Sequence, residues 1–214
     1  MPATLRVNFF FSFFFLALLC FFSPLLWRGA GGEAFSQQNI RTHQLISGKK
    51  EVKVQTIAQD HNRTIWVGTE SGLVSYNGIA YKLFQKKDGL ADNAVAALFE
   101  APDSTLWIGH SNGRVTLRKN GVFSAFSLQD TSNKNRITCF INDAKQNTWI
   151  ATYGSGVYKY DRKNLLHYNS ENGLGDDYVY TLSEVSPGKI WMGTDAGITV
   201  FNDVTKNEKE KFSR

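Results

Sequence analysis

An internal repeat built around tryptophan constrains the fold of this chain more than any other feature of its sequence. The stretch TIWVGTESGLVSY, which begins at Thr64, recurs as TLWIGHSNGRVTL, TWIATYGSGVYKY and IWMGTDAGITVF. The anchoring residues are Trp66, Trp107, Trp149 and Trp191, which are separated by 41, 42 and 42 residues. A period in the low forties is typical of a four-stranded propeller blade, whereas leucine-rich repeats are shorter, at about 20 to 29 residues. The sequence therefore predicts an all-β fold, a β-propeller with four recognisable blades.

Other positions keep register with the tryptophans. An apolar residue stands twelve positions before each Trp, and another stands nine positions before it. These residues are Val54, Val95, Ile137 and Val179, and Ile57, Leu98, Phe140 and Leu182. In the first repeat, the segments VKVQTIAQD, IWVGTE, LVSYN and AYKLFQ predict four short strands that turn residues separate. We expect the blades at residues 54–87, 95–128, 137–169 and 179–214.

The number of blades leaves two arrangements open. Propellers contain from about four to eight blades, so four can close into a small ring if residues 40–46 supply the outer strand of the last blade. The alternative, which we favour, is that these blades form part of a larger ring and that the chain is truncated. In that arrangement one blade face would lack a neighbour and expose apolar surface.

The Trp-Gly motif has a structural interpretation. Burying a Trp removes roughly 150–250 Å² from water, which at about 25 cal/mol per Å² contributes on the order of 4–6 kcal/mol before the entropy loss. A small residue two positions after the Trp allows neighbouring blades to approach closely. The residues to which we assign these blade-core roles are Trp66, Trp107, Trp149, Trp191, Gly68, Gly109 and Gly193, with Ala151 in the third repeat.

The first 36 residues have the layout of a secretory signal peptide. Arg6 precedes a nearly uninterrupted apolar run from Phe9 to Trp27, and the small-x-small sequence AFS precedes Gln37. The alternative is an uncleaved membrane anchor over residues 9–27, because about 18 apolar residues can span a bilayer. Both interpretations predict an exported, periplasmic protein that meets the membrane only through this segment.

Charge and cysteine content narrow the class of partner. The chain has 24 Lys and Arg residues against 19 Asp and Glu residues, a net charge of +5, and it contains no basic block. We therefore expect no nucleic-acid partner. Only Cys139 lies beyond the predicted signal peptide, so we expect neither a disulfide framework nor a Cys-x-x-Cys metal site. Its apolar neighbours indicate a core thiol.

Histidines and aspartates give little support for catalysis. The histidines are His43, His61, His110 and His167, and they lack the close spacing of a zinc site. Asp60, Asp103 and Asp143 lie in or before turns, and capping those turns explains them. We therefore expect no catalytic residue, no metal and no cofactor.

The repeat resembles that of the two-component regulator propeller family. The residues that carry this resemblance are QDHNRTIWVGTESGLVSYNG and YKLFQKKDGLADNAV, and the match extends over residues 40–203. The resemblance implies the periplasmic sensor region of a bacterial signalling protein, often a hybrid histidine kinase that detects sugars or other nutrients, with sensor and kinase domains following in full-length relatives. The chain departs from the family pattern at His110, where Thr is expected, at Arg114, where Leu is expected, and at DTSNKNR, which replaces the DGL connection.

Ligand binding is the function that we expect. In a propeller, the connections that lead into the inner strands gather at one mouth of the central channel. By register, these connections contribute Asp92, Asn93, Asn135, Arg136, Asp177 and Tyr178. Arg136 could pair with a carboxylate or sulfate and Tyr178 could stack on a sugar or aromatic ring, so a small molecule or glycan is the expected ligand. The alternatives are that these are solvated loop residues, and that the protein is a propeller hydrolase or lyase, or a structural interaction module.

Overall fold

The computed structural model describes residues 46–47, 50–128, 134–203 and 212–213 of the 214-residue chain. The chain divides into two compact units, residues 1–51 and 52–214. In the first unit, β1 (Ile46–Ser47) pairs antiparallel with β2 (Lys50–Glu51). The predicted signal peptide or anchor, His43 and residues 40–45 of the predicted closing strand lie outside the described residues. Within the described part of the chain, no helix is long and apolar enough to cross a membrane.

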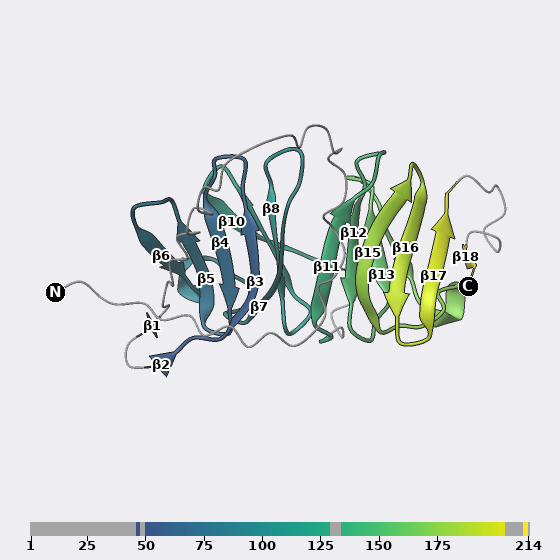
Figure 1. Cartoon of the computed structure of the whole chain (residues 1–214), viewed down its shortest axis with the longest axis horizontal. Helices are drawn as coiled ribbons and strands as arrows, with labels where there is room; N and C mark the ends of the chain where they lie inside the picture. The colour runs from purple at the N-terminus through teal and green to yellow at the C-terminus, as the bar shows by residue number, and fades with distance from the viewer. Residues whose placement is uncertain (1–45, 48–49, 129–133, 204–211, 214) are drawn as a thin grey trace, which may run out of the picture. The chain divides into compact units, whose positions relative to one another are not determined.

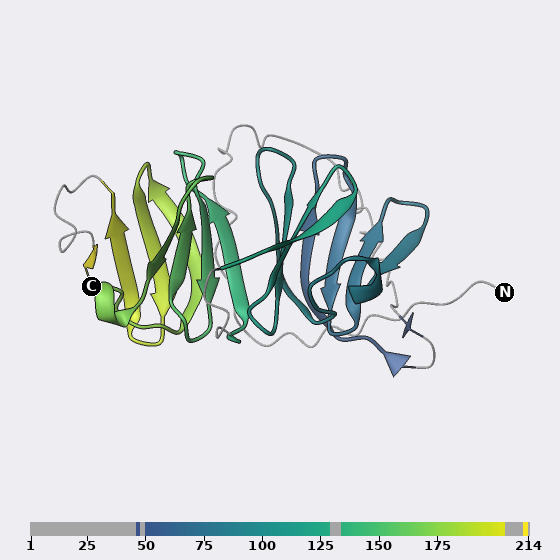
Figure 2. The ribbon, with the colours of Figure 1, turned by 180° about the vertical axis from the view of Figure 1, so that it is seen from behind.

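The second unit contains four four-stranded antiparallel sheets, which follow one another in chain order from blue to yellow (Figures 1 and 2). Blade 1 consists of β3 (Val54–Gln59), β4 (Ile65–Thr69), β5 (Gly72–Tyr76) and β6 (Tyr81–Phe84). Blade 2 consists of β7 (Val95–Glu100), β8 (Leu106–His110), β9 (Val115–Lys119) and β10 (Val122–Phe126). Blade 3 consists of β11 (Ile137–Asn142), β12 (Thr148–Thr152), β13 (Val157–Tyr160) and β14 (Leu165–Tyr168). Blade 4 consists of β15 (Val179–Ser186), β16 (Lys189–Thr194), β17 (Gly197–Asn202) and β18 (Phe212–Ser213).

Each sheet is a meander in which every strand pairs with the strand that follows it in the chain. Short 3-10 helices, η1 (Lys86–Asp88) and η2 (Ser170–Asn172), lie in the connections that follow blades 1 and 3. The prediction of an all-β fold made of four-stranded propeller blades is confirmed.

Aspartates close the turn between the first and second strands of blades 1 and 3. Asp60 and Asp143 each accept a hydrogen bond from the backbone N–H four residues later, at 2.8 Å in both blades. Their second carboxylate oxygens accept the indole N–H of Trp66 at 2.8 Å and of Trp149 at 2.9 Å. The expected turn-capping role is confirmed, and each carboxylate also holds the Trp of its own blade in place.

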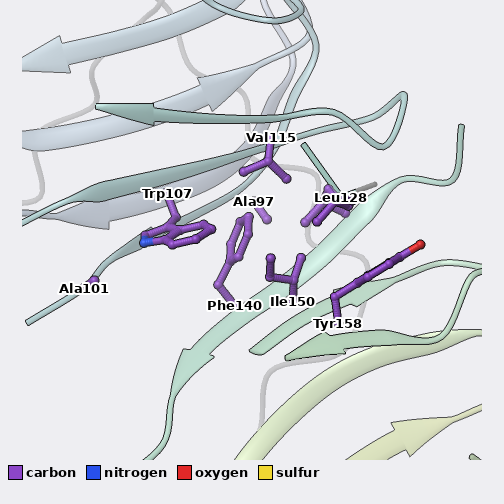
Figure 3. Close-up of a cluster of buried hydrophobic side chains, with 9 residues drawn as sticks. Ala97, Ala101, Trp107, Val115, Leu128, Phe140, Ile150 and Tyr158 are labelled. Carbon is purple, nitrogen blue, oxygen red and sulfur yellow. The ribbon is translucent and has the colours of Figure 1, made fainter. Parts of the chain in front are cut away.

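Buried apolar side chains fill the junctions between successive blades. The junction of blades 1 and 2 contains Trp66, Leu73, Phe84, Leu90, Val95, Leu106 and Ile108. The junction of blades 2 and 3 includes Ala97, Trp107, Val115, Phe140, Ile150 and Tyr158 (Figure 3). The junction of blades 3 and 4 includes Trp149, Val157, Val179, Leu182, Met192 and Phe201. The core therefore lies between blades, and each blade depends on its neighbour for burial.

The tryptophan column does not behave uniformly. Trp66, Trp107 and Trp149 are 2%, 4% and 0% exposed, as expected of wedges between blades. Trp191 is 40% exposed, on blade 4, which also exposes Val185 and Ile198. No blade follows blade 4 in the part of the chain that the structure describes, so the wedge role of Trp191 stays a prediction, and its exposure is that of a blade face without a neighbour.

Two further observations concern the ends of the blade series. A Cβ atom on Gly68 would lie 2.6 Å from Cγ1 of Val95 in the next blade, whereas one on Gly193 would meet only Thr181 of its own blade, at 2.9 Å. The outer strand of blade 4 is β18, which pairs with β17. Of the predicted closing strand at residues 40–46, only Ile46 is described, and it belongs to β1, so the closing role stays a prediction.

Candidate functional site

The six predicted site residues all lie in the connections that lead into the inner strands, but most of their polar groups already have partners within the protein. Asp92 accepts hydrogen bonds from the backbone N–H of Ala94 and from the side chain of Asn112, both at 3.0 Å. Asn93 accepts the backbone N–H of Lys86 at 2.8 Å. These two side chains therefore brace the connection between blades 1 and 2.

The same bracing occurs in the later connections. The amide nitrogen of Asn135 donates to the hydroxyl of Ser155 at 2.7 Å. The carboxylate of Asp177 accepts the backbone N–H of Ser170 at 2.7 Å and its hydroxyl at 2.9 Å. These contacts explain why Asn and Asp recur at these positions without a ligand being involved.

Arg136 and Tyr178 differ from the other four, because they link separate blades. A guanidinium nitrogen of Arg136, at the start of blade 3, donates to the side-chain oxygen of Gln55 in blade 1 at 2.9 Å. The backbone carbonyl of Arg136 accepts the N–H of Tyr153 at 2.9 Å. Tyr153 in turn forms an isolated antiparallel bridge with Tyr178. A continuous set of contacts therefore connects Arg136 to the entry of blade 4.

Three exposed tyrosines, Tyr153, Tyr178 and Tyr180, meet at this point and are called the tyrosine cluster below. The ring of Tyr153 lies 5.0 Å from that of Tyr178 and 5.5 Å from that of Tyr180, with interplanar angles of 72° and 57°. Each of the three residues is between 42% and 46% exposed. Such a cluster offers several aromatic surfaces to one ligand, because rings inclined to one another present both faces and edges.

A carboxylate completes the tyrosine cluster. The hydroxyl of Tyr180 donates a short hydrogen bond to Asp195. This hydrogen bond is the main cause that raises the pKa of Tyr180 above its ordinary value, so the hydroxyl keeps its proton and remains a donor. Asp195 is itself exposed and can accept further hydrogen bonds from a ligand.

The local sequence explains how Tyr153 reaches blade 4. The third repeat has one extra residue in its β12–β13 hairpin, and Gly154 there adopts a φ of +111°, which favours glycine. The backbone N–H groups of Gly154 and Gly156 both donate to the carbonyl of Asp177, at 3.0 and 2.9 Å. The lengthened hairpin is thereby fastened to the connection that precedes blade 4.

Sequence reasoning therefore identified Arg136 and Tyr178 but missed Gln55, Tyr153, Tyr180 and Asp195. Two signals were present in the sequence. The extra hairpin residue marked Tyr153, and the alternation of Tyr178 and Tyr180 placed both side chains on the same face of the strand.

The three histidines that the structure describes do not assemble into a second centre. His61 contacts Glu100 at 2.6 Å, His110 contacts Thr116 at 2.8 Å, and His167 contacts the carbonyl of Ser155 at 2.7 Å, each in a different blade. The described residues contain no group of three His, Cys, Asp or Glu side chains that could hold a metal ion.

Cys139 lies against the hydrophobic cluster between blades 3 and 4. Burial raises the pKa of the Cys139 thiol above its ordinary value, because an apolar environment disfavours the thiolate. A thiol in this state is a poor nucleophile.

Comparison with known proteins finds similarity to the propellers of two-component regulators. The family model described as "Two component regulator propeller" matches residues 48–71 and 173–196. Among curated proteins, Histidine kinase P4 of Formosa agariphila is 26% identical over 186 residues, which cover 74% of this chain and 13% of the kinase. The chain thus spans only a small part of that relative.

Solved structures share the fold. The extracellular domain of the putative hybrid two component system BT3049 from B. thetaiotaomicron superposes with a TM-score of 0.66 at 22% identity, covering 77% of this chain and 24% of that one. Virginiamycin B lyase from Staphylococcus aureus superposes with a TM-score of 0.55 at 14% identity, covering 78% of this chain and 60% of the lyase. At these identities the likeness concerns the propeller architecture alone.

Proposed function

Because this chain belongs to the two-component regulator propeller family, we propose that it is an extracytoplasmic ligand-sensing segment of a two-component signalling protein. The observation that carries the proposal is the tyrosine cluster, in which exposed aromatic rings from blades 3 and 4 converge beside Asp195. The similar structure from B. thetaiotaomicron is that of an extracellular domain, which supports export by the N-terminal segment.

The ligand of this site is a small molecule or glycan with a flat apolar face and peripheral hydroxyl groups. The apolar face stacks on the rings of Tyr153 and Tyr178, and a hydroxyl donates to the carboxylate of Asp195. Ligands with a carboxylate or sulfate gain from Arg136, whose backbone carbonyl accepts the N–H of Tyr153.

A ligand at this site contacts two blades at once. Tyr153 belongs to the hairpin of blade 3, whereas Tyr178 and Tyr180 belong to the entry and inner strand of blade 4. A ligand that contacts both blades stabilises the relative arrangement of the blades in which all its contacts form at once. Such a difference in affinity between two arrangements is the only way in which ligand binding can be signalled to further domains. The proposed role is therefore recognition without turnover.

The test is isothermal titration against mono- and oligosaccharides and small carboxylic acids, with Tyr178→Ala and Tyr180→Ala as variants. We expect each variant to raise the Kd of a bound ligand about tenfold or more, because an aromatic contact contributes roughly 1 kcal/mol in addition to the free energy from burying its apolar area. Tyr81→Ala is the matched control, because Tyr81 is 41% exposed and stacks on Tyr76 in blade 1.

Three results would contradict the proposal in different ways. Unchanged affinity in both cluster variants would remove the tyrosine cluster from the site. Chemical conversion of a bound compound by the purified chain would favour a hydrolase or lyase. Failure of every compound to bind, together with stable capture of a periplasmic protein, would favour a structural interaction module.

A further inference from the structure

Successive blades are joined by a hydrogen bond that recurs at two of the three junctions. At the junction of blades 1 and 2, the backbone N–H of His61 donates to a carboxylate oxygen of Glu100 at 2.7 Å. At the junction of blades 3 and 4, the backbone N–H of Ala144 donates to a carboxylate oxygen of Glu184 at 2.8 Å. In both cases the turn after an inner strand is tied to the inner strand of the next blade. We call this contact the junction brace.

The junction of blades 2 and 3 lacks this brace because its residues differ at both positions of the contact. Pro102 occupies the position of His61 and Ala144, and proline has no backbone N–H to donate. Asn142 occupies the position of Glu100 and Glu184. The side-chain oxygen of Asn142 is buried and has no hydrogen-bond partner.

The carboxylate that holds the Trp in blades 1 and 3 is missing from blade 2 as well. Ala101 stands where the other two blades have Asp60 and Asp143. The indole N–H of Trp107 therefore has no carboxylate beside it, and no other described residue accepts it. Figure 3 shows the nitrogen end of the Trp107 ring on the side of Ala101. One buried acceptor and one donor are thus left without partners at the same junction.

A cavity lies at this junction. Its volume is about 280 Å³, and its lining includes Pro102, Asp103, Trp107, Asn142, Tyr160 and Arg162. This volume is close to the lower limit of small-molecule sites, which is about 300 Å³. The cavity adjoins the turn after the inner strand β7, whereas Asp92 and Asn93 precede that strand. It therefore lies at the opposite end of the inner strands from the connections that carry the tyrosine cluster.

We propose that this cavity is a second binding site, for a small polyhydroxylated molecule. A hydroxyl group can both accept and donate a hydrogen bond, so adjacent hydroxyls can accept from the indole N–H of Trp107 and donate to the oxygen of Asn142. Leaving the buried oxygen of Asn142 unpaired is costly, and pairing it contributes to the binding energy of the ligand. Tyr160 supplies an aromatic wall.

Charged side chains at the edge of the cavity indicate which polyhydroxylated molecules bind best. Lys119 forms an ion pair with Asp103 at 2.7 Å, so their charges largely cancel. A guanidinium nitrogen of Arg162 has a neutral partner, the side-chain oxygen of Gln146, at 3.4 Å. The wall therefore carries one excess positive charge, and a carboxylated sugar should bind more tightly than its neutral counterpart.

The first test records the indole N–H resonances of the full chain by ¹H–¹⁵N NMR during titration with glycerol, D-glucose and D-glucuronate. The spectrum of Trp107→Phe assigns the Trp107 resonance. We expect this resonance to shift saturably with at least one sugar, and D-glucuronate should saturate the shift at the lowest concentration. The Trp149 resonance should not move, because its N–H is bonded to Asp143. A Trp107 resonance that none of the three compounds moves would mean that the cavity holds water only.

The second test rebuilds the missing contacts in the variant Ala101→Asp, Pro102→Ala, Asn142→Glu. It gives the second junction the donor and acceptors found at the other two, so the Kd of the sugar should rise at least about tenfold with no loss of Tm. Equal affinity in the rebuilt variant and the parent chain would overturn the proposal. Should the rebuilt variant fail to fold, Asn142→Leu removes the side-chain amide with its unpaired oxygen and should weaken binding roughly three- to tenfold.

Tyr178→Ala separates this site from the tyrosine cluster. The response of Trp107 should be unchanged in that variant, whereas a ligand of the tyrosine cluster should be lost. Loss of the Trp107 response in Tyr178→Ala would instead assign both effects to one site and remove the second. The two proposals can therefore fail independently.

Discussion

Ile137 of blade 3 stands directly against Gly109 of blade 2. A Cβ atom on Gly109 would lie 2.5 Å from Cγ2 of Ile137 and 3.0 Å from Cε2 of Phe140. Blade 3 has Ala151 at the equivalent position, but there the inner-strand residue of the next blade is the smaller Val179. At the junction of blades 2 and 3, the side chains of Ile137 and Phe140 thus leave no room for a Cβ atom at position 109.

Gly109→Ala should therefore destabilise the protein by overpacking, at a cost of about 1–3 kcal/mol in the free energy of unfolding. Gly193→Ala is the matched control, because the added methyl group would meet only Thr181 of its own blade. Urea unfolding of both variants measures the difference. Equal losses of stability in the two variants would show that crowding within a blade, and not between blades, explains the small residue.

The exposure of Trp191 leads to a second prediction. Trp149→Ala removes a fully buried ring from the junction of blades 3 and 4 and should cost about 3–5 kcal/mol. Trp191→Ala removes a ring that is already 40% exposed and should cost roughly half as much or less. Thermal and urea unfolding of the two variants, which carry the same chemical change, would test this. A larger loss for Trp191→Ala would imply that its ring is covered in solution.

The repeat predicted the blades well because the same position of the inner strand is buried in blades 2, 3 and 4. Val95, Ile137 and Val179, identified by register alone, are all fully buried at the starts of inner strands. The same register could not predict the exposure of Trp191, since a repeat reveals the role of a position but not whether a neighbour is present.

The candidate site was harder to predict because it depends on departures from the repeat. Tyr153 reaches Tyr178 only because one added residue lengthens a hairpin, and the amount of displacement follows from geometry between blades. Likewise, Ala101 and Pro102 look like ordinary turn residues in the sequence. Their consequence becomes visible only when Asn142 of the next blade is placed opposite them.

His110 makes the stability of blade 2 dependent on pH. It occupies the position of the hairpin threonines Thr69, Thr152 and Thr194, and one ring nitrogen is buried without a partner. Burial, the largest cause, lowers the pKa of His110 to about 4. The unfolded chain, with a pKa near 6.5, therefore binds a proton at a higher pH than the folded chain does.

Because of this difference, stability is independent of His110 above about pH 6.5 and falls as the pH is lowered toward 4, by about 3 kcal/mol in total. His110→Thr should remove this part of the pH dependence. The measurement is urea unfolding of the parent and the variant at pH 7 and pH 4.5. Parallel losses of stability in both proteins over this range would contradict the assignment to His110.

Asp143 should be the most important turn residue of blade 3, because its buried carboxylate serves several donors at once. One oxygen accepts the backbone N–H of Asn147, and the other accepts the Asn147 amide and the indole N–H of Trp149, at 2.8 and 2.9 Å. Asp143→Ala would leave these donors unpaired within the protein, so we expect a loss of about 2–4 kcal/mol in the free energy of unfolding.

Asp161→Ala provides the comparison. Asp161 caps the β13–β14 turn by accepting the N–H groups of Lys163 and Asn164, but it is exposed. In Asp161→Ala the freed N–H groups can bond to water, so the loss of stability measured by urea unfolding should be clearly smaller. A loss as large as that of Asp143→Ala would mean that burial of the carboxylate does not determine the effect.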